Sequence, residues 1–260
     1  VQNADQENEG SAPADPVLVL QAMGRKIGFI PAAARLADPD RVMPLQIYLA
    51  EYSCPLAQLA DQVNDQLKRD RRCIVVISEG FAVGDIGERK DAFGHTQFSS
   101  SETTVAQTVV NYLNRVGLAA KGAARGNVPG TDQRHSMAYA STVDLEEAYR
   151  VGQTAAHLAA TRQSGYMATI LRNPGAAYSV RYDKVPLAEV ANSERTFPAA
   201  WIANSRIDVT DDFVRYAKPL VGEGMLSLPM IDGRQRMTQL RPIYAGQKLA
   251  RYVPQADRAS

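Results

Sequence analysis

The sequence predicts an α/β fold in which a parallel sheet carries helices on both faces. Three short, continuously apolar segments at residues 17–20, 45–49 and 73–78 favour this fold, because a strand that is buried on both faces has no polar alternation. Residues 30–37 and 55–69 lie between these segments and have the composition or spacing of helices. Strands that alternate with helices in this order are typical of a parallel sheet.

The later part of the chain is expected to add two helices and two strands. Helices are predicted at residues 101–116 and 142–162. The second is favoured by acidic residues in its first turns, where the helix dipole stabilises negative charge. Strands are predicted at residues 166–172 and 178–182, joined by the turn sequence Asn-Pro-Gly at residues 173–175.

The sequence predicts one continuous region that follows a tail. Residues 1–16 are polar, acidic or turn-forming, and they are expected to form a flexible loop or tail because they offer little to bury. A second, polar loop is expected at residues 80–101. Residues 17–260 contain no sharp linker.

Composition excludes several classes of protein. With 45% hydrophobic and 22% charged residues, the 260-residue chain is typical of a soluble globular protein. Its net charge of +1 is too small for a general nucleic-acid binder, and its apolar runs are too short to span a membrane. We therefore expect no nucleic-acid or membrane partner, a cytoplasmic location, and reduced thiols at Cys54 and Cys73.

Candidate binding residues follow the predicted strands, because ligands of open α/β sheets bind beyond the carboxyl ends of the strands. Gly24 and Arg25 follow the first strand; glycine permits close approach to the backbone, and arginine attracts anions. Glu79 follows the third strand, where its carboxylate is suited to accept hydrogen bonds from sugar hydroxyls. The alternatives are a turn with a solvated arginine and a glutamate that caps a helix or forms an ion pair.

A loop rich in glycine and proline, residues 125–134, is a third candidate because an arginine stands at each end. Arg125 and Arg134 are suited to clamp a phosphate between two guanidinium groups; the alternative is that both form surface ion pairs. The three histidines lack metal-ligand spacing, and no serine or cysteine has the setting of a nucleophile. Neither a metal site nor a nucleophile is therefore predicted.

Three motifs in register resemble those of the phosphofructokinase family. Residues 19–28, which contain Met-Gly-Arg, resemble the family's VEVMGR-x-x-G segment, and residues 74–80 resemble its strand that ends in a sugar-contacting glutamate. Residues 129–134, Pro-Gly-Thr-Asp-Gln-Arg, are similar to the start of its LGxxQRGGxPxxxDR region. Residues 197–202 and 216–220 look like the larger, pyrophosphate-dependent members.

The resemblance implies a binding site for fructose 6-phosphate. Met23, Gly24 and Arg25 would contact the sugar phosphate, Glu79 its hydroxyl groups, and Arg134 its 6-phosphate. Positioning of this kind, together with electrostatic stabilisation, is what phosphoryl transfer requires.

Two further residues of the third motif take their roles from the same resemblance. Arg125 matches a family arginine that, in ATP-dependent relatives, reaches a neighbouring subunit, and this implies a homodimer. Thr131 is assigned to substrate binding, although it stands where the family has histidine or tyrosine.

The implied activity is that of a glycolytic enzyme, a phosphotransferase that uses Mg²⁺ to move phosphate from pyrophosphate to the 1-hydroxyl of fructose 6-phosphate. The family's Gly-Gly-Asp donor loop and its TIDxD segment have no match, because none of the 18 glycines are adjacent and residues 231–233, Ile-Asp-Gly, read as a turn. We therefore interpret the chain as a carboxyl-terminal portion whose catalytic base is unknown and whose partner is a missing amino-terminal half. The alternatives are an ATP-dependent enzyme and a non-catalytic sugar-phosphate-binding or regulatory subunit.

Overall fold

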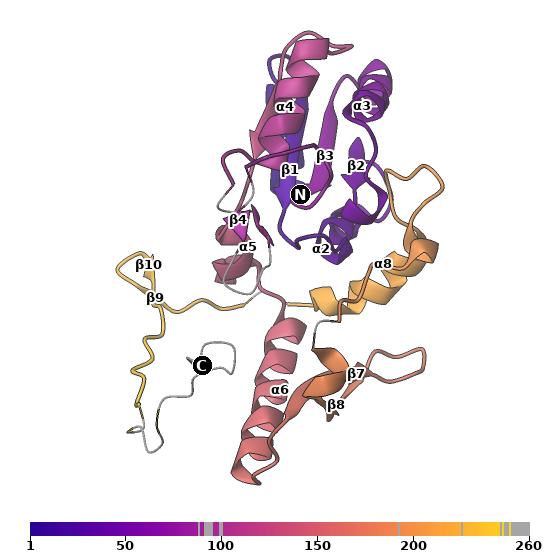
Figure 1. The fold of residues 1–260 in the computed structure, drawn as a ribbon. Coiled ribbons are helices and arrows are strands. Elements are labelled where there is room, and N and C mark those ends of the chain that lie inside the picture. Colours follow the sequence, from indigo (N-terminus) through magenta and orange to yellow (C-terminus); the bar gives the residue numbers. More distant parts are fainter. Residues whose placement is uncertain are drawn as a thin grey trace. The chain divides into compact units, whose positions relative to one another are not determined.

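A four-stranded parallel sheet organises the larger of two units, Val1–Leu226, in this computed structural model (Figure 1). The structure describes residues 1–87, 89–90, 96–98, 101–191, 193–224, 226–244, 246 and 250. The strands lie in the order β2-β3-β1-β6, and each neighbouring pair is parallel. Their bounds are β1 Val17–Ala22, β2 Leu45–Tyr48, β3 Cys73–Ser78 and β6 Ala124–Asn127. The predicted α/β fold class is confirmed.

Strand β3 shows why the sheet carries helices on both faces. All six of its residues are buried. Cys73, Val75 and Ile77 belong to one apolar cluster, which contains the buried faces of α3 (Leu56–Asp70) and α4 (Val105–Val116). Ile74 and Val76 belong to a second cluster on the other face, with α2 (Phe29–Ala32) and α8 (Asp211–Ala217). Because successive strand residues point to opposite faces, one continuous apolar run fills two cores.

Capping residues mark several helix ends. Ser141 Oγ accepts a hydrogen bond from Asp144 N at 3.2 Å, so the predicted start of α6 (Thr142–Ala160) is confirmed. Helix α4 begins in the same way at Thr104. Helix α3 ends at Asp70, and the next residue, Arg71, caps it in the left-handed conformation with φ 64°. Among the described residues, no helix combines the length and the apolar character that a membrane span needs.

Helix α6 packs against an antiparallel pair, β7 (Tyr166–Arg172) and β8 (Val180–Pro186). The predicted turn sequence lies between these strands, but the second strand runs later than expected. The guanidinium group of Arg172 lies 4.9 Å from the ring centroids of both Tyr178 and Tyr216, and its Nη1 donates to Tyr216 O at 2.7 Å. These contacts tie β7 to α8.

Two predicted loops contain secondary structure. Gln2–Ser11 forms helix α1 instead of a flexible tail, since Asp5 is buried and pairs with Arg72 at 2.5 Å, next to the start of β3. Tertiary contact therefore orders a segment that has little to bury by itself. Within the loop predicted at residues 80–101, β4 (Arg89–Lys90) pairs with β5 (Thr96–Gln97), while residues 88, 91–95 and 99–100 lie outside the described part.

The chain forms two compact units, and the second begins at Ser227. The second unit, Ser227–Ser260, contains a short hairpin of β9 (Met230–Ile231) and β10 (Arg234–Gln235). Asp232 and Gly233 join the two strands with φ angles of 49° and 74°. The turn predicted at residues 231–233 is confirmed.

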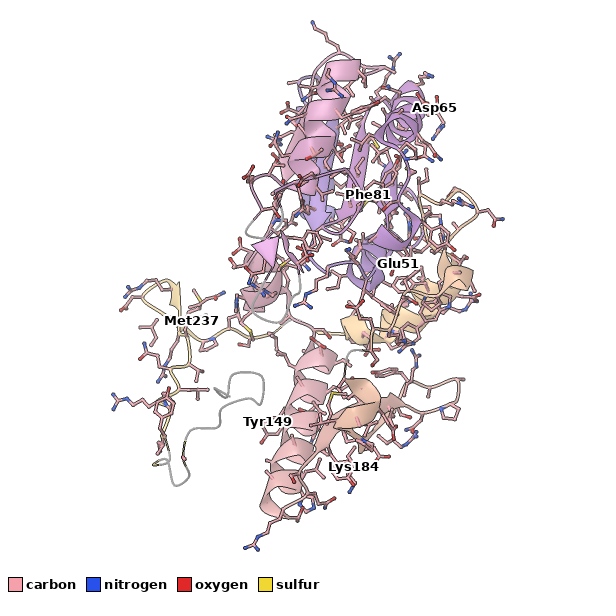
Figure 2. All side chains as sticks on the ribbon, in the orientation of Figure 1. Glu51, Asp65, Phe81, Tyr149, Lys184 and Met237 are labelled. Atoms are coloured by element: carbon pink, nitrogen blue, oxygen red, sulfur yellow. The ribbon has the colours of Figure 1, made fainter. Side chains whose placement is uncertain are left out.

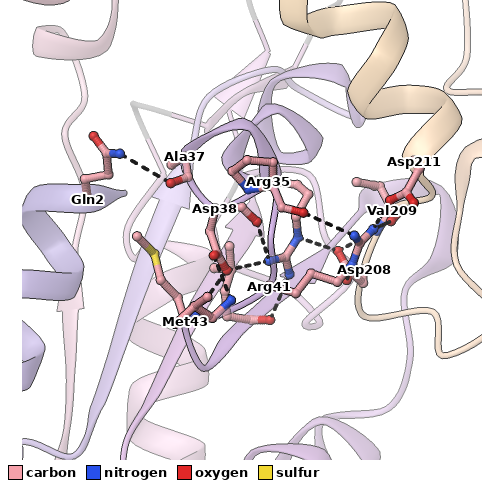
Figure 3. Close-up of polar contacts among 12 residues, drawn as sticks. Gln2, Arg35, Ala37, Asp38, Arg41, Met43, Asp208, Val209 and Asp211 are labelled. Atoms are coloured by element: carbon pink, nitrogen blue, oxygen red, sulfur yellow. Dashed lines mark hydrogen bonds and ion pairs between the residues drawn. The ribbon is translucent and has the colours of Figure 1, made fainter.

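A buried arginine joins two distant segments of the first unit (Figure 3). The side chain of Arg35 is only 2% exposed, and it pairs with Asp38 at 2.8 Å and with Asp208 at 2.9 Å. Arg41 pairs with the same Asp208 at 3.1 Å and with Asp211 at 2.8 Å. Because these bonds satisfy the charge of Arg35 inside the protein, the start of α8 is held against the segment that precedes β2.

We predict that Arg35→Met lowers the free energy of unfolding by about 3–5 kcal/mol, because Asp38 would remain buried without its counterion. Urea unfolding followed by circular dichroism measures this change. Arg150→Met is the matched control, since Arg150 pairs with Glu146 on the exposed face of α6 and its loss should change the free energy by less than about 1 kcal/mol. Equal effects of the two substitutions would contradict the prediction.

Candidate functional site

The carboxyl ends of β1 and β3 lie side by side and bring together the first two predicted motifs. Ala22 pairs with Ser78 in the sheet, so Glu79 emerges next to the loop at residues 23–25. Glu79 Oε1 accepts hydrogen bonds from Gly24 N at 3.0 Å and from Arg25 N at 2.8 Å. The Glu79 side chain is buried, and it makes no other side-chain hydrogen bond to a described residue. One carboxylate oxygen thus shapes the loop.

Small residues permit the close approach of these two segments. Gly24 has φ +142° and Arg25 has φ 54°, both outside the range that most residues adopt. Ser78 Oγ donates to Arg25 O at 3.0 Å. A Cβ atom at Gly80 would lie 2.3 Å from the same carbonyl oxygen. Each residue of the sequence Ser-Glu-Gly at the end of β3 therefore contributes to the fit of the loop at residues 23–25.

The third motif reaches the same edge through β6 and α5 (Asp132–His135). Strand β6 is the other neighbour of β1, with Asn127 opposite Leu20. Gln133 Oε1 accepts a hydrogen bond from Met23 N at 2.9 Å, which fixes α5 against the loop after β1. Thr131 and Arg134 flank this contact and are exposed. Gln133 was not a predicted site residue, although its place in the third motif was a signal for it.

Arg125 does not join this group, and the predicted clamp with Arg134 is wrong. Arg125 lies near the amino end of β6, opposite Leu18, and so at the other end of the sheet from Met23. Its guanidinium pairs with Glu7 of α1 and lies 3.7 Å from Asp15. The prediction treated residues 125–134 as one loop, whereas the first three of them, residues 125–127, belong to strand β6, and this strand separates the two arginines.

An open depression of about 960 Å³ lies beside Arg25. It is lined by residues from the loop after β1, from α2, from the segment before residue 197 and from α8: Arg25, Ile27, Phe29, Ser193, Glu194, Arg195 and Tyr216. The segment at residues 193–195 was not among the predicted sites, because it follows no strand of the parallel sheet and carries no motif.

Glu51, which is labelled in Figure 2, attaches this distant segment to the start of α2. Its Oε1 accepts hydrogen bonds from Gly28 N at 2.8 Å and from Phe197 N at 3.1 Å. The ring of Phe197 packs edge-on to that of Phe29 with their centroids 5.2 Å apart. A carboxylate and an aromatic contact therefore place residues 193–197 next to the loop that contains Arg25.

The described residues contain no group of three histidine, cysteine, aspartate or glutamate side chains that is placed to hold a metal ion. A Mg²⁺ ion that is bound together with pyrophosphate needs only one or two protein carboxylates, because phosphate oxygens and waters complete its coordination. Cys54 and Cys73 are free thiols, and burial raises the pKa of Cys73 far above its ordinary value.

Comparison with known proteins gives related sequences and folds, although no family model matches. The pyrophosphate–fructose 6-phosphate 1-phosphotransferase of Rhodospirillum rubrum is 35% identical over 219 residues, 80% of this chain and 53% of the relative. The enzyme of the same name from Xanthomonas campestris is 30% identical, over 90% of this chain and 56% of the relative. The chain thus spans about half the length of these curated relatives.

A solved structure supports the same relationship. The pyrophosphate-dependent phosphofructokinase of Nitrosospira multiformis superimposes with a TM-score of 0.78 and 28% identity, over 97% of this chain and 59% of the other.

We predict that Gly80→Ala destabilises the protein by about 1–3 kcal/mol, because the added Cβ would collide with Arg25 O and move the loop after β1. The measurement is the midpoint and slope of urea unfolding. Gly152→Ala, in α6 with no atom within 4 Å of the added Cβ, is the matched control and should be neutral or stabilising by up to about 1 kcal/mol. An unchanged Gly80→Ala protein would show that the loop is not held as described.

Proposed function

This chain is phosphofructokinase-like in sequence and in fold, and from that premise we propose that it carries the fructose 6-phosphate site of a pyrophosphate-dependent phosphofructokinase. The reaction would transfer phosphate from pyrophosphate to the 1-hydroxyl of fructose 6-phosphate, giving fructose 1,6-bisphosphate and phosphate. The observation that carries this proposal is the buried Glu79 carboxylate, which binds the backbone of the exposed Arg25. The same loop is bonded to Gln133, the neighbour of the exposed Arg134.

The proposed roles follow from the chemistry of each group. Glu79 uses Oε1 to hold the backbone, and its second oxygen is suited to accept hydrogen bonds from sugar hydroxyls. Arg134 would bind the 6-phosphate, because a guanidinium donates two parallel hydrogen bonds to phosphate oxygens. Thr131 and the loop at residues 23–25 would complete the binding surface.

Several components of the proposed activity are not assigned to residues of this chain. The donor site and the catalytic base are assigned to none of the residues described above. Mg²⁺ is proposed to accompany pyrophosphate, and no step here depends on where it binds. A cytoplasmic homodimer is proposed, in which Arg125, partly exposed beside Glu7, would face the second subunit.

A second candidate is a non-catalytic sugar-phosphate-binding or regulatory subunit. It would need only the acceptor-side motifs, which converge at the carboxyl ends of β1, β3 and β6.

We predict that the protein as it is isolated, with any chain that copurifies, forms fructose 1,6-bisphosphate from fructose 6-phosphate when pyrophosphate is supplied. An assay coupled to aldolase, with parallel reactions in pyrophosphate and in ATP, measures this product. Turnover only with ATP would replace the proposed donor, and binding of fructose 6-phosphate without turnover by either donor would favour the non-catalytic reading.

We predict that Arg134→Ala raises the dissociation constant for fructose 6-phosphate by about tenfold or more, because a charge-assisted hydrogen bond to phosphate is lost. Binding of unphosphorylated fructose should change by less than about twofold. Isothermal titration calorimetry with both sugars tests this, and Arg150→Ala, an exposed arginine on α6, is the control. An equal loss for both sugars would remove Arg134 from the phosphate-binding role.

A further inference from the structure

Two arginines from distant parts of the sequence line the same depression. Arg25 belongs to the loop after β1, and Arg195 belongs to the segment before Phe197. Both are exposed, and neither forms an ion pair with any residue that the structure describes. Glu194 also lines the depression and contributes one negative charge. The arginines therefore outnumber the acidic side chains in this lining.

Packing and hydrogen-bond contacts of its neighbours fix the position of Arg195. Its guanidinium carbon lies 5.5 Å from the ring centroid of Phe29, which itself packs against Phe197 and Trp201. The backbone at Phe197 is held by Glu51, which also holds the residue before Phe29. A cation over an aromatic face retains its N–H groups for other partners, because the ring occupies only one side of the guanidinium plane.

We propose that Arg195 acts with Arg25 as a two-guanidinium site for a phosphate group of a substrate. Phosphate is the chemistry that fits, since it carries up to two negative charges and accepts bidentate hydrogen bonds from arginine. This inference rests on the proposed function and adds a residue that the three motifs do not contain. The phosphate belongs either to fructose 6-phosphate or to pyrophosphate, and the experiment separates these two sources.

The test compares binding of fructose 6-phosphate, pyrophosphate and inorganic phosphate by calorimetry, using the protein as isolated. Arg195→Gln should weaken binding of at least one of these ligands by about tenfold, and the ligand affected identifies the source of the phosphate. Arg195→Lys should restore part of the loss, because it keeps the charge. Arg206→Gln is the control, since Arg206 also lies over an aromatic ring, that of Tyr52, and is outside this depression.

The outcomes separate this inference from the proposed function. If Arg25→Gln or Arg134→Ala weakens binding of fructose 6-phosphate while Arg195→Gln leaves all three ligands unchanged, the role of Arg195 is overturned and the proposed function stands. If fructose 6-phosphate does not bind to the unmodified protein but Arg195→Gln weakens binding of phosphate or pyrophosphate, the phosphate site stands and the proposed sugar site fails. No binding of any of the three ligands would overturn both.

Discussion

The candidate site depends on one carboxylate oxygen. Glu79 Oε1 accepts the N–H groups of Gly24 and Arg25, and so converts the end of β1 from an extended chain into a turned loop. The alternative for these two N–H groups is solvent, which would leave the loop without a defined shape. Because Glu79 directly follows a fully buried strand, its backbone has little conformational freedom. Its hydrogen bonds to Gly24 and Arg25 therefore also restrict the conformation of the loop.

The buried sheet also determines which segments can meet at this edge. Strand β1 has β3 on one side and β6 on the other, all parallel, so three carboxyl ends open on the same side. Gln133 uses this arrangement to attach α5 to Met23. In the same sheet Arg125 lies near the amino end of β6, where its guanidinium group pairs with Glu7 and Asp15 of the amino-terminal segment.

Arginine side chains inside the fold form ion pairs, whereas two arginines at the surface form none with described residues. Arg35 is buried and completely paired, and it joins two segments that lie far apart in the sequence. Arg25 and Arg195 are exposed and border a depression, without an ion pair to any described residue. A buried guanidinium group thus joins segments of the chain, whereas an exposed one is available to bind an anion from solution. The two roles differ in the burial of the side chain and in its ion-pair partners.

The sequence by itself determined the parallel sheet, the start of α6 and the motifs that contain Met23, Glu79 and Gln133, because apolar runs, caps and turn residues act within a few positions of the chain. Only the tertiary structure decided the helix at Gln2–Ser11, the place of Arg125 on β6, and the approach of Arg195 to Arg25. Each of these depends on contacts between segments remote in sequence, such as Asp5 with Arg72 or Glu51 with Phe197. No local pattern encodes such contacts.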